Sequence, residues 1–233
     1  MKKYKRIVFL TGAGISKESG LATFRDEDGL WNNHRVEDVA TIEAFNKNPD
    51  YVHGFYNDMR PELFCAKPNE AHKAITKLQE NYDGEVFVVT QNIDTLHEKA
   101  GNKNIFHIHG IINEIVCLNC GNIIKAWGEA SSETICEKCE TVGFMKPNIV
   151  FFGETPLFMD KVEMLLKTAD LFVSVGTSGV VYPAAGFVRT AKYYGADTVD
   201  VNVEACFNPY FDRRIIGKAG EVLPIFVDEL LQG

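Results

Sequence analysis

The chain has 233 residues, 45% of them hydrophobic and 24% charged, which is the composition of a globular protein long enough to bury a core of its own. The formal net charge is −8 at pH 7, and a negative field of this kind disfavours nucleic acid and anionic membrane surfaces as partners. No apolar run approaches the ~20 residues of a membrane span. The apolar run at residues 7–10 is too short for a secretory signal, so we expect a cytoplasmic protein.

The first predicted element is a short buried strand, residues 6–10, that runs into the glycine-rich turn TGAGIS at residues 11–16. Glycines let the backbone turn tightly and approach a pyrophosphate, whose charge is then stabilised by the amides at a helix start. The turn matches the dinucleotide pattern G-x-G-x-x-G only in part, because Lys17 stands at the third glycine position and the next glycine is Gly20. A nucleotide site and a plain structural turn both remain open from this motif alone.

The segment 20–31 is too polar and too rich in glycine for a helix, and it carries Phe24, Arg25 and Trp31. Such a loop beside a phosphate-binding turn can close over a cofactor, or it can be a surface loop with Phe24 in the core. Residues 36–64 then have a helical pattern, with Thr41 and Asn48 as caps. We interpret them as a small helical insertion.

The centre of the chain holds two apolar runs with the length and β-branched content of buried parallel strands, residues 86–89 and 105–108. A helical segment, residues 94–100, lies between them. Gln91, Asn92 and Asp94 follow the first run, and His109 ends the second. Ligands of open α/β sheets bind at the carboxyl ends of the strands, so these groups predict an active site. The alternative is that they only cap a helix and that His107 and His109 are ordinary strand histidines.

The remaining segments continue the alternation of helices and strands. Helices are predicted after Asn69, over 155–169, over 183–194 and over 221–231, and strands over 171–175 and 198–203. This order is typical of a doubly wound parallel α/β sheet.

Four of the six cysteines form two C-x-x-C pairs separated by fifteen residues: Cys117, Cys120, Cys136 and Cys139. Two such pairs supply the four thiolates of a tetrahedral zinc site, and the alternative is two redox pairs or four cysteines spaced by chance. Four protein ligands leave no open position on the metal, so we expect one structural zinc ion.

Taken in order, these features resemble the sirtuins, the family of NAD-dependent protein deacylases. The motifs that carry the resemblance are GAGIS at 12–16, TFR at 23–25, TQNID at 90–94, HG at 109–110, the cysteine pairs, VFFGE at 150–154, GTS at 176–178 and VN at 201–202. The resemblance implies a Rossmann-like NAD-binding domain of residues 1–35, 66–112 and 145–233. A small domain would combine the helical insertion 36–65 with the zinc module 113–144.

The resemblance also implies the reaction. The acyl oxygen of a modified lysine attacks the nicotinamide ribose, which releases nicotinamide and forms an O-alkylamidate. His109 then deprotonates a ribose hydroxyl, a task that suits an imidazole with an unperturbed pKa near ~6.5. The products are free lysine, nicotinamide and O-acyl-ADP-ribose. Asn92 is the second implied catalytic residue.

The positions that match the family's NAD site are Gly12, Ala13, Gly14, Ile15, Ser16, Thr23, Phe24, Arg25, Trp31, Gln91, Asn92, Ile93, Asp94, Gly176, Thr177, Ser178, Asn202, Val203, Glu204 and Ala219. The positions that match its acyl-lysine peptide site are Tyr56, Met59, Val150, Phe151, Phe152, Gly153, Glu154 and Val181. The peptide is expected to lie there as an added strand.

Acyl selectivity is expected to depend on Met59. In the desuccinylase branch of the family, a tyrosine and an arginine three residues later bind the acyl carboxylate. Tyr56 matches the tyrosine, but Met59 stands at the arginine position and Arg60 follows it. We therefore expect deacetylation to be preferred over desuccinylation, unless Pro61 breaks the helix and brings Arg60 into the pocket.

Two other functions remain open from the sequence: protein ADP-ribosyl transfer, which uses the same bond cleavage, and a non-catalytic NAD-sensing module. The expected partners are acyl-lysine proteins or peptides, with no nucleic acid and no membrane. The oligomeric state is not determined by the sequence, and a monomer is favoured.

Overall fold

The computed structural model describes residues 4–22, 30–31, 34–204 and 207–233. Its main element is a six-stranded parallel sheet in the order β11-β10-β9-β1-β4-β5. These strands are β1 (Arg6–Thr11), β4 (Glu85–Thr90), β5 (Ile105–His107), β9 (Leu171–Val175), β10 (Asp197–Asn202) and β11 (Arg213–Ile216). In chain order this is the 3-2-1-4-5-6 arrangement of dinucleotide-binding sheets, which confirms the predicted fold class.

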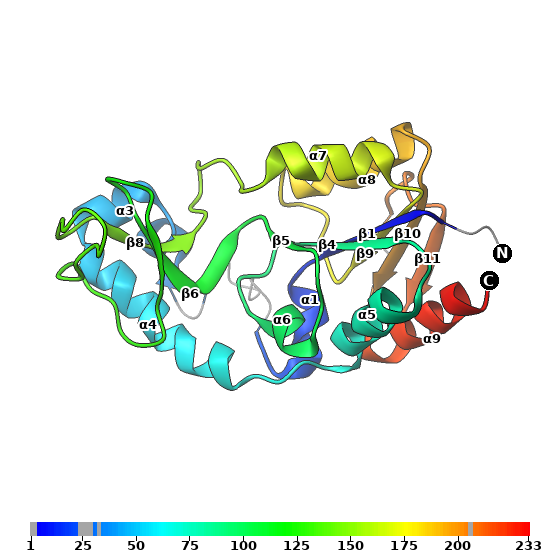
Figure 1. Cartoon of the computed structure of the whole chain (residues 1–233), viewed down its shortest axis with the longest axis horizontal. Coiled ribbons are helices and arrows are strands. Elements are labelled where there is room, and N and C mark those ends of the chain that lie inside the picture. Colours follow the sequence, from blue (N-terminus) through cyan, green and yellow to red (C-terminus); the bar gives the residue numbers. More distant parts are fainter. Residues whose placement is uncertain (1–3, 23–29, 32–33, 205–206) are drawn as a thin grey trace.

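Helices cover both faces of this sheet (Figure 1). One face packs against α5 (Glu70–Asn81) and α9 (Ala219–Gln232), and the other against α7 (Met159–Thr168) and α8 (Phe187–Tyr193). Successive residues of β1 alternate between the two layers: Ile7 and Phe9 face the first, Val8 and Leu10 the second. All four are at most 4% exposed, so the strand is buried on both sides, as parallel sheets require.

A second group of elements lies at the far end of the molecule from the chain termini (Figure 1). It contains the helices α2 (Val36–Val39), α3 (Ile42–Lys47) and α4 (Pro49–Cys65), and an antiparallel sheet of β7 (Ile123–Lys125), β6 (Gly110–Cys117) and β8 (Met145–Ile149). Thr41 and Asn48 cap α3 and α4 through their side chains, as the sequence predicted. The shorter elements of the described chain are α1 (Ala13–Ser16), α6 (Leu96–Ala100), and the paired strands β2 (Leu30–Trp31) and β3 (His34–Arg35).

Several helix boundaries differ from the sequence prediction by one or more residues: the helix predicted over 94–100 begins at Leu96, and the one predicted over 221–231 begins at Ala219. Two helices begin at least four residues later than predicted or in another form. The helix expected from residue 155 begins at Met159, because the backbone amide of Leu157 bonds to Ile108 O and Phe158 has a left-handed φ of 60°. The helix expected from residue 183 begins as a 3₁₀ turn, Ala184–Gly186, and continues as α8 from Phe187. No helix of the described chain is long and apolar enough to cross a membrane.

Candidate active site

Most of the predicted site residues surround one cavity of about 850 Å³. It lies where the loops after β1, β4, β9 and β10 meet, beside the switch in strand order between β1 and β9. The predicted cofactor residues that line it are Gly12, Ala13, Gly14, Ser16, Trp31, Gln91, Asn92, Ile93, Asp94, Gly176, Thr177, Ser178, Asn202, Val203, Glu204 and Ala219. The predicted base and substrate residues that line it are His109, Met59, Val150, Phe151, Phe152, Gly153, Glu154 and Val181.

Two predicted residues lie behind the cavity wall. Ile15 is fully buried in the core below the glycine turn. Tyr56 is also fully buried and stacks on Phe151, with ring centroids 6.2 Å apart. Their contact with a bound molecule therefore stays a prediction. Thr23, Phe24 and Arg25 lie outside the described residues.

The glycine turn after β1 packs directly on the turn after β9. The amide of Gly14 donates to Gly176 O at 2.9 Å, and a Cβ atom on Gly14 would lie 2.7 Å from the Cα of Gly176. Gly176 itself has a φ of +61°, which favours glycine. The two turns can approach only because both positions lack a side chain, and this contact forms one wall of the cavity.

Ser16, Asn92 and Asp94 form a hydrogen-bonded group on that wall. Asn92 Nδ2 donates to Gly12 O at 3.0 Å and to Ser16 Oγ at 3.1 Å, and Ser16 Oγ donates to Asp94 Oδ2 at 2.8 Å. Asp94 Oδ1 accepts the amide of Leu96 at the start of α6. The three side chains are at most 9% exposed, so the polar groups expected to hold the nicotinamide end are rigidly fixed.

His109 lines the same cavity as the glycine turn and lies just beyond the end of β5. Its Nδ1 is 3.0 Å from Gln91 O, and because a carbonyl oxygen only accepts, Nδ1 carries the hydrogen. In the neutral ring Nε2 is then a free base. Burial lowers the pKa of His109 below its usual value, with the Gln91 carbonyl acting against this. His109 therefore has the ionisation state and orientation of a general base at neutral pH.

A second layer of support, which the sequence pattern does not indicate, lies below these residues. His97 is 1% exposed, and its Nε2 lies 3.0 Å from Thr11 Oγ1 while its Nδ1 lies 2.5 Å from Asn102 Oδ1. Burial lowers the pKa of His97, so the neutral ring links the end of β1 to the end of α6. Only its position three residues after Asp94 in the predicted polar cluster could have suggested this role.

The segment 150–153 forms a rim of the cavity and is tied to the segment of the base by backbone hydrogen bonds. The amide of Val150 donates to His109 O at 2.9 Å, and the amide of Leu157 donates to Ile108 O at 2.9 Å. On its other side, the amide of Phe152 donates to Ala40 O at 2.9 Å. An extended segment that enters a cavity in this way is suited to pair with a peptide strand.

The helix α4 brings Met59, and not Arg60, to the cavity. Met59 lines the cavity together with Leu63 from the next turn. Arg60 is 3% exposed and points elsewhere, because its Nε donates to Ile112 O at 3.1 Å and its Nη1 bonds to Asn57 Oδ1. Pro61 lies inside α4, which continues to Cys65. The alternative in which Pro61 breaks the helix is therefore wrong.

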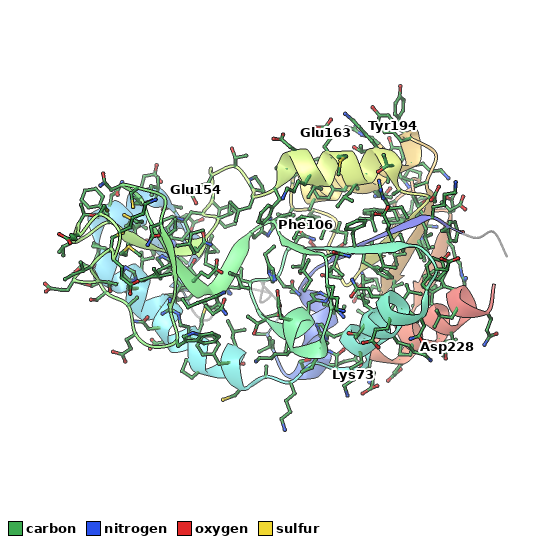
Figure 2. The ribbon with its side chains drawn as sticks, in the orientation of Figure 1. Lys73, Phe106, Glu154, Glu163, Tyr194 and Asp228 are labelled. Atoms are coloured by element: carbon green, nitrogen blue, oxygen red, sulfur yellow. The ribbon has the colours of Figure 1, made fainter. Side chains whose placement is uncertain are left out.

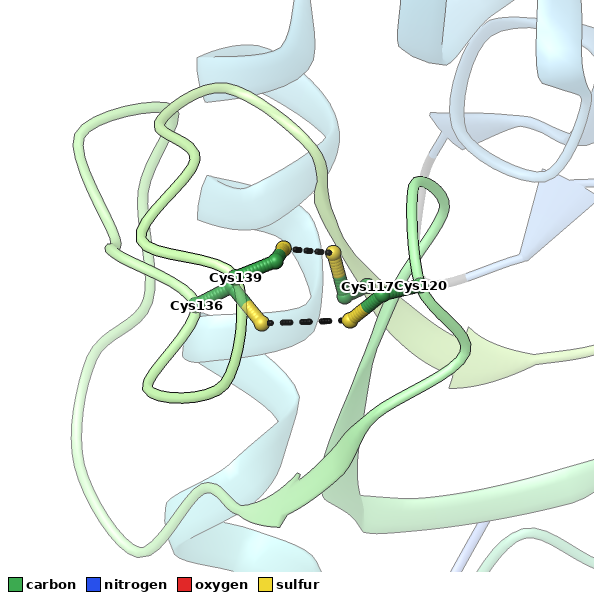
Figure 3. Close-up of side chains that lie close together, drawn as sticks. All are labelled: Cys117, Cys120, Cys136 and Cys139. Carbon is green, nitrogen blue, oxygen red and sulfur yellow. Dashed lines mark hydrogen bonds between the residues drawn. The ribbon is translucent and has the colours of Figure 1, made fainter.

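The four paired cysteines meet at the ends of two loops (Figure 3). The Sγ atoms of Cys117 and Cys139 are 3.6 Å apart, as are those of Cys120 and Cys136, and all four lie within 4.8 Å of one another. Thiolates at the Zn–S distance of about 2.3 Å in a tetrahedron lie about 3.8 Å apart, whereas a disulfide needs about 2.05 Å. The residues therefore fit the expected structural zinc ion.

Comparison with known proteins agrees with this geometry. The family model described as Sir2 family matches residues 12–183. The chain is 48% identical to the NAD-dependent protein deacylase SIR2rp3 of Leishmania major, over 100% of this chain and 98% of that protein. It is 49% identical to an NAD-dependent protein deacylase of Vibrio vulnificus, over 98% and 94% of the two chains.

Solved structures give the same result. A Sir2 homologue in complex with NAD superimposes with a TM-score of 0.88 at 35% identity, over 98% of this chain and 90% of that chain. Another neighbour, Sir2Af2 bound to a myristoylated histone peptide, has a TM-score of 0.75 at 36% identity, over 99% and 92% of the two chains. The resemblance inferred from the sequence motifs is confirmed, and the chain belongs to the Sir2 family.

Proposed function

We propose that this protein is an NAD-dependent protein-lysine deacylase, in which acyl-lysine, NAD and water give free lysine, nicotinamide and O-acyl-ADP-ribose. The observation that carries the proposal is the shared cavity of His109, the Asn92 and Asp94 cluster, the glycine turn and the 150–153 rim. The names of the relatives from Leishmania major and Vibrio vulnificus support the same activity.

The residues divide the work between binding and proton transfer. The amides at the glycine turn stabilise the pyrophosphate, and Asn92 with Asp94 orients the nicotinamide end. NAD supplies the labile bond between nicotinamide and ribose and the sugar that receives the acyl group. His109 Nε2 accepts the proton of a ribose hydroxyl, since Nδ1 is occupied by Gln91 O. The 150–153 rim holds the peptide by backbone pairing, which makes binding tolerant of peptide sequence.

The acyl group is expected to be acetyl or a longer apolar chain rather than succinyl. Met59 and Leu63 present apolar surface to the cavity, and Arg60 is engaged with Ile112 O and Asn57. A succinyl carboxylate would enter this region without a bidentate guanidinium partner. Charge-assisted hydrogen bonds contribute about 1.5 to 3 kcal/mol, which corresponds to roughly ten- to over a hundredfold in preference. The myristoylated peptide bound by the neighbour Sir2Af2 supports an apolar acyl channel.

Incubation of the purified protein with NAD and an acetyl-lysine peptide, followed by mass spectrometry, tests the proposal. Loss of the acetyl mass from the peptide with matching amounts of nicotinamide and O-acetyl-ADP-ribose is the expected result. A peptide that gains the mass of ADP-ribose would instead identify an ADP-ribosyltransferase. No turnover of NAD, with NAD bound, would identify a non-catalytic module.

A further inference from the structure

The catalytic loop is the segment 91–94 after β4, which lines the cofactor cavity. His107 contacts this loop but lines a different cavity. It ends β5, and its side chain is 10% exposed. Its Nδ1 is 2.9 Å from Asn92 O, and its Nε2 is 2.7 Å from Glu98 Oε1 on α6. A carbonyl oxygen and a carboxylate both accept hydrogen bonds and donate none. Both contacts are therefore satisfied only when each ring nitrogen carries a hydrogen, which is the imidazolium form.

Asn92 is thus held from two sides. Its side-chain amide bonds to Gly12 O and Ser16 Oγ in the cofactor turn, whereas its backbone carbonyl accepts from His107. If His107 loses its proton, one of its two nitrogens becomes an acceptor that faces another acceptor, so one of the two contacts is lost. A small displacement of a residue that orients the reacting group costs a large factor in rate.

The charged and titratable groups around His107 favour its protonated form. Glu98 faces it from α6, Asp94 lies on the loop before α6, and His97 on α6 is held neutral by burial. Burial alone would lower the pKa of His107, but the hydrogen bond and charge of Glu98, with the Asn92 carbonyl and Asp94, raise it above its usual value.

The other charged residues near this pair have partners of their own. Lys99 Nζ donates to three carbonyl oxygens, those of Leu63, Phe64 and Ala66 at the end of α4. Lys125 and Glu114 pair with each other at 2.8 Å. Among the residues that the structure describes, Glu98 is thus the carboxylate in direct contact with His107.

A second cavity, of about 900 Å³, gives the pair access to solvent. His107, Glu98, Lys99, Glu114 and Lys125 line it, and the Glu98 side chain is 40% exposed. His107 consequently lies between the backbone of the catalytic loop, which it contacts at Asn92 O, and the Glu98 carboxylate, which solvent can reach. Its proton can exchange with solvent without passing through the cofactor cavity.

We propose that the His107–Glu98 pair is a positioning device that fixes the backbone of Asn92 for turnover and works only while His107 is protonated. The inference rests on the proposed deacylase function, because it concerns the same site. Its consequence is a two-sided pH dependence of kcat. Activity rises with pH as the base His109 loses its proton, and it falls again at higher pH as His107 loses its own.

The test is the pH profile of kcat and of KM for NAD and for an acetyl-lysine peptide, in the wild type, His107→Gln and Glu98→Gln. In Glu98→Gln the carboxylate that favours the imidazolium is gone, so the falling limb is expected to move to lower pH. In His107→Gln the titrating group is gone, so the falling limb is expected to disappear and kcat to drop about ten- to a hundredfold, with KM for the peptide unchanged. Glu114→Gln is the matched control: it removes a carboxylate from the same cavity without touching Asn92 and should keep the wild-type profile.

A kcat close to that of the wild type in His107→Gln, with the falling limb unaltered, would overturn the proposal. Thermal unfolding at each pH separates loss of folding from loss of positioning. Histidine-selective NMR titration of the wild type and Glu98→Gln gives an independent readout that needs no turnover. A titration midpoint of His107 that is the same in both proteins contradicts the pairing, whereas an inactive wild type with the expected shift contradicts only the deacylase function.

Discussion

Lys146 and Glu154 form a mostly buried ion pair beneath the rim that is expected to bind the peptide. Lys146 Nζ is 3.0 Å from Glu154 Oε2, and the same oxygen accepts the amide of Phe151 at 2.6 Å. Nζ also donates to Ile149 O at 2.7 Å and lies 3.7 Å from the ring centroid of Phe151. Glu154 is the residue after the rim segment 150–153, in the loop that connects β8 to α7 (Figure 2). The pair thus fixes the backbone on both sides of Val150.

We expect Glu154→Gln to lower both stability and peptide binding. The Lys146 side chain is only 4% exposed, so its charge depends on this carboxylate. The expected loss is about 1 to 3 kcal/mol in the free energy of unfolding, measured in urea, together with a higher KM for the peptide. Glu163→Gln removes the exposed pair with Lys167 and should change stability by less than about 0.5 kcal/mol. Equal effects of the two substitutions would contradict the prediction.

His109→Ala should abolish deacylation while the protein still folds and binds NAD. General bases contribute typically about 10² to 10⁴ in rate, so kcat is expected to fall by that order. The pKa of His109 is lowered by burial, and the neutral form is the active one. The rising limb of the wild-type profile should therefore have its midpoint below the ordinary histidine value of ~6.5. Deacylation by His109→Ala near the wild-type rate would exclude this role.

Cys136→Ala should remove the zinc ion and part of the stability together. Cys136 is fully buried among the four thiols, and the free energy of metal binding contributes to folding. Elemental analysis is expected to find one zinc per wild-type chain and much less in the variant. Cys65→Ala, at an exposed cysteine outside the cluster, should keep both metal and stability. A wild-type protein that is active without zinc would contradict the assignment.

Met59→Arg should raise the catalytic efficiency for a succinyl-lysine peptide relative to its acetyl counterpart. A guanidinium at this position would face the cavity that Met59 lines and pair with the acyl carboxylate. A gain of about tenfold or more in the ratio is expected. Arg60→Ala is the control for selectivity, because Arg60 bonds to Ile112 O outside the cavity. Efficient desuccinylation by the wild type that Arg60→Ala removes would reverse this prediction.

Gly14→Ala should weaken NAD binding by separating the two turns that form the cavity wall. The added Cβ would lie 2.7 Å from the Cα of Gly176, a backbone atom that cannot move independently. Gly54→Ala is the matched control, since no described atom outside the adjacent residues and the backbone of α4 lies within 4 Å of its Cβ position. Alanine there should stabilise the helix by about 0.5 to 1 kcal/mol. Calorimetric titration with NAD that gives equal affinities for both variants would contradict this account.

The sequence predicted those parts of the fold whose signal is local. β1, β4 and β9 are buried on both faces, so they are short runs of apolar residues that periodicity and composition identify. β11 was missed because it is an edge strand, Arg213–Ile216, whose two arginines are exposed and whose conformation depends on pairing with β10. The start of α7 was misplaced because a hydrogen bond to Ile108 O, distant in the chain, holds Leu157 outside the helix.

The same distinction applies to the site. The glycine turn, His109 and the cysteine pairs have residue types and spacings that indicate their chemistry. Other residues of the site have no such local signal, because only tertiary packing brings them to their partners. His97 contacts Thr11, Lys146 contacts Glu154, and Glu98 contacts His107. Arg60 has a residue type that suggests a role in the site, but its position in the helix prevents it. It is one residue after Met59, so its side chain points to Ile112 O, whereas Met59 lines the cavity.

The backbone bonds between His109 and Val150 and between Ile108 and Leu157 have a mechanical consequence. They join the segment that carries the base to the segment expected to carry the peptide, so the two translate as one body. The glycine turn is joined to the base through the central sheet, because the amide of Gln91 donates to Thr11 O and the amide of Ile108 donates to Thr90 O. The base and the peptide rim are therefore connected directly, by adjacent backbone hydrogen bonds, and not through the cofactor. Their geometry does not depend on bound NAD, so product release need not disassemble the proton-transfer geometry.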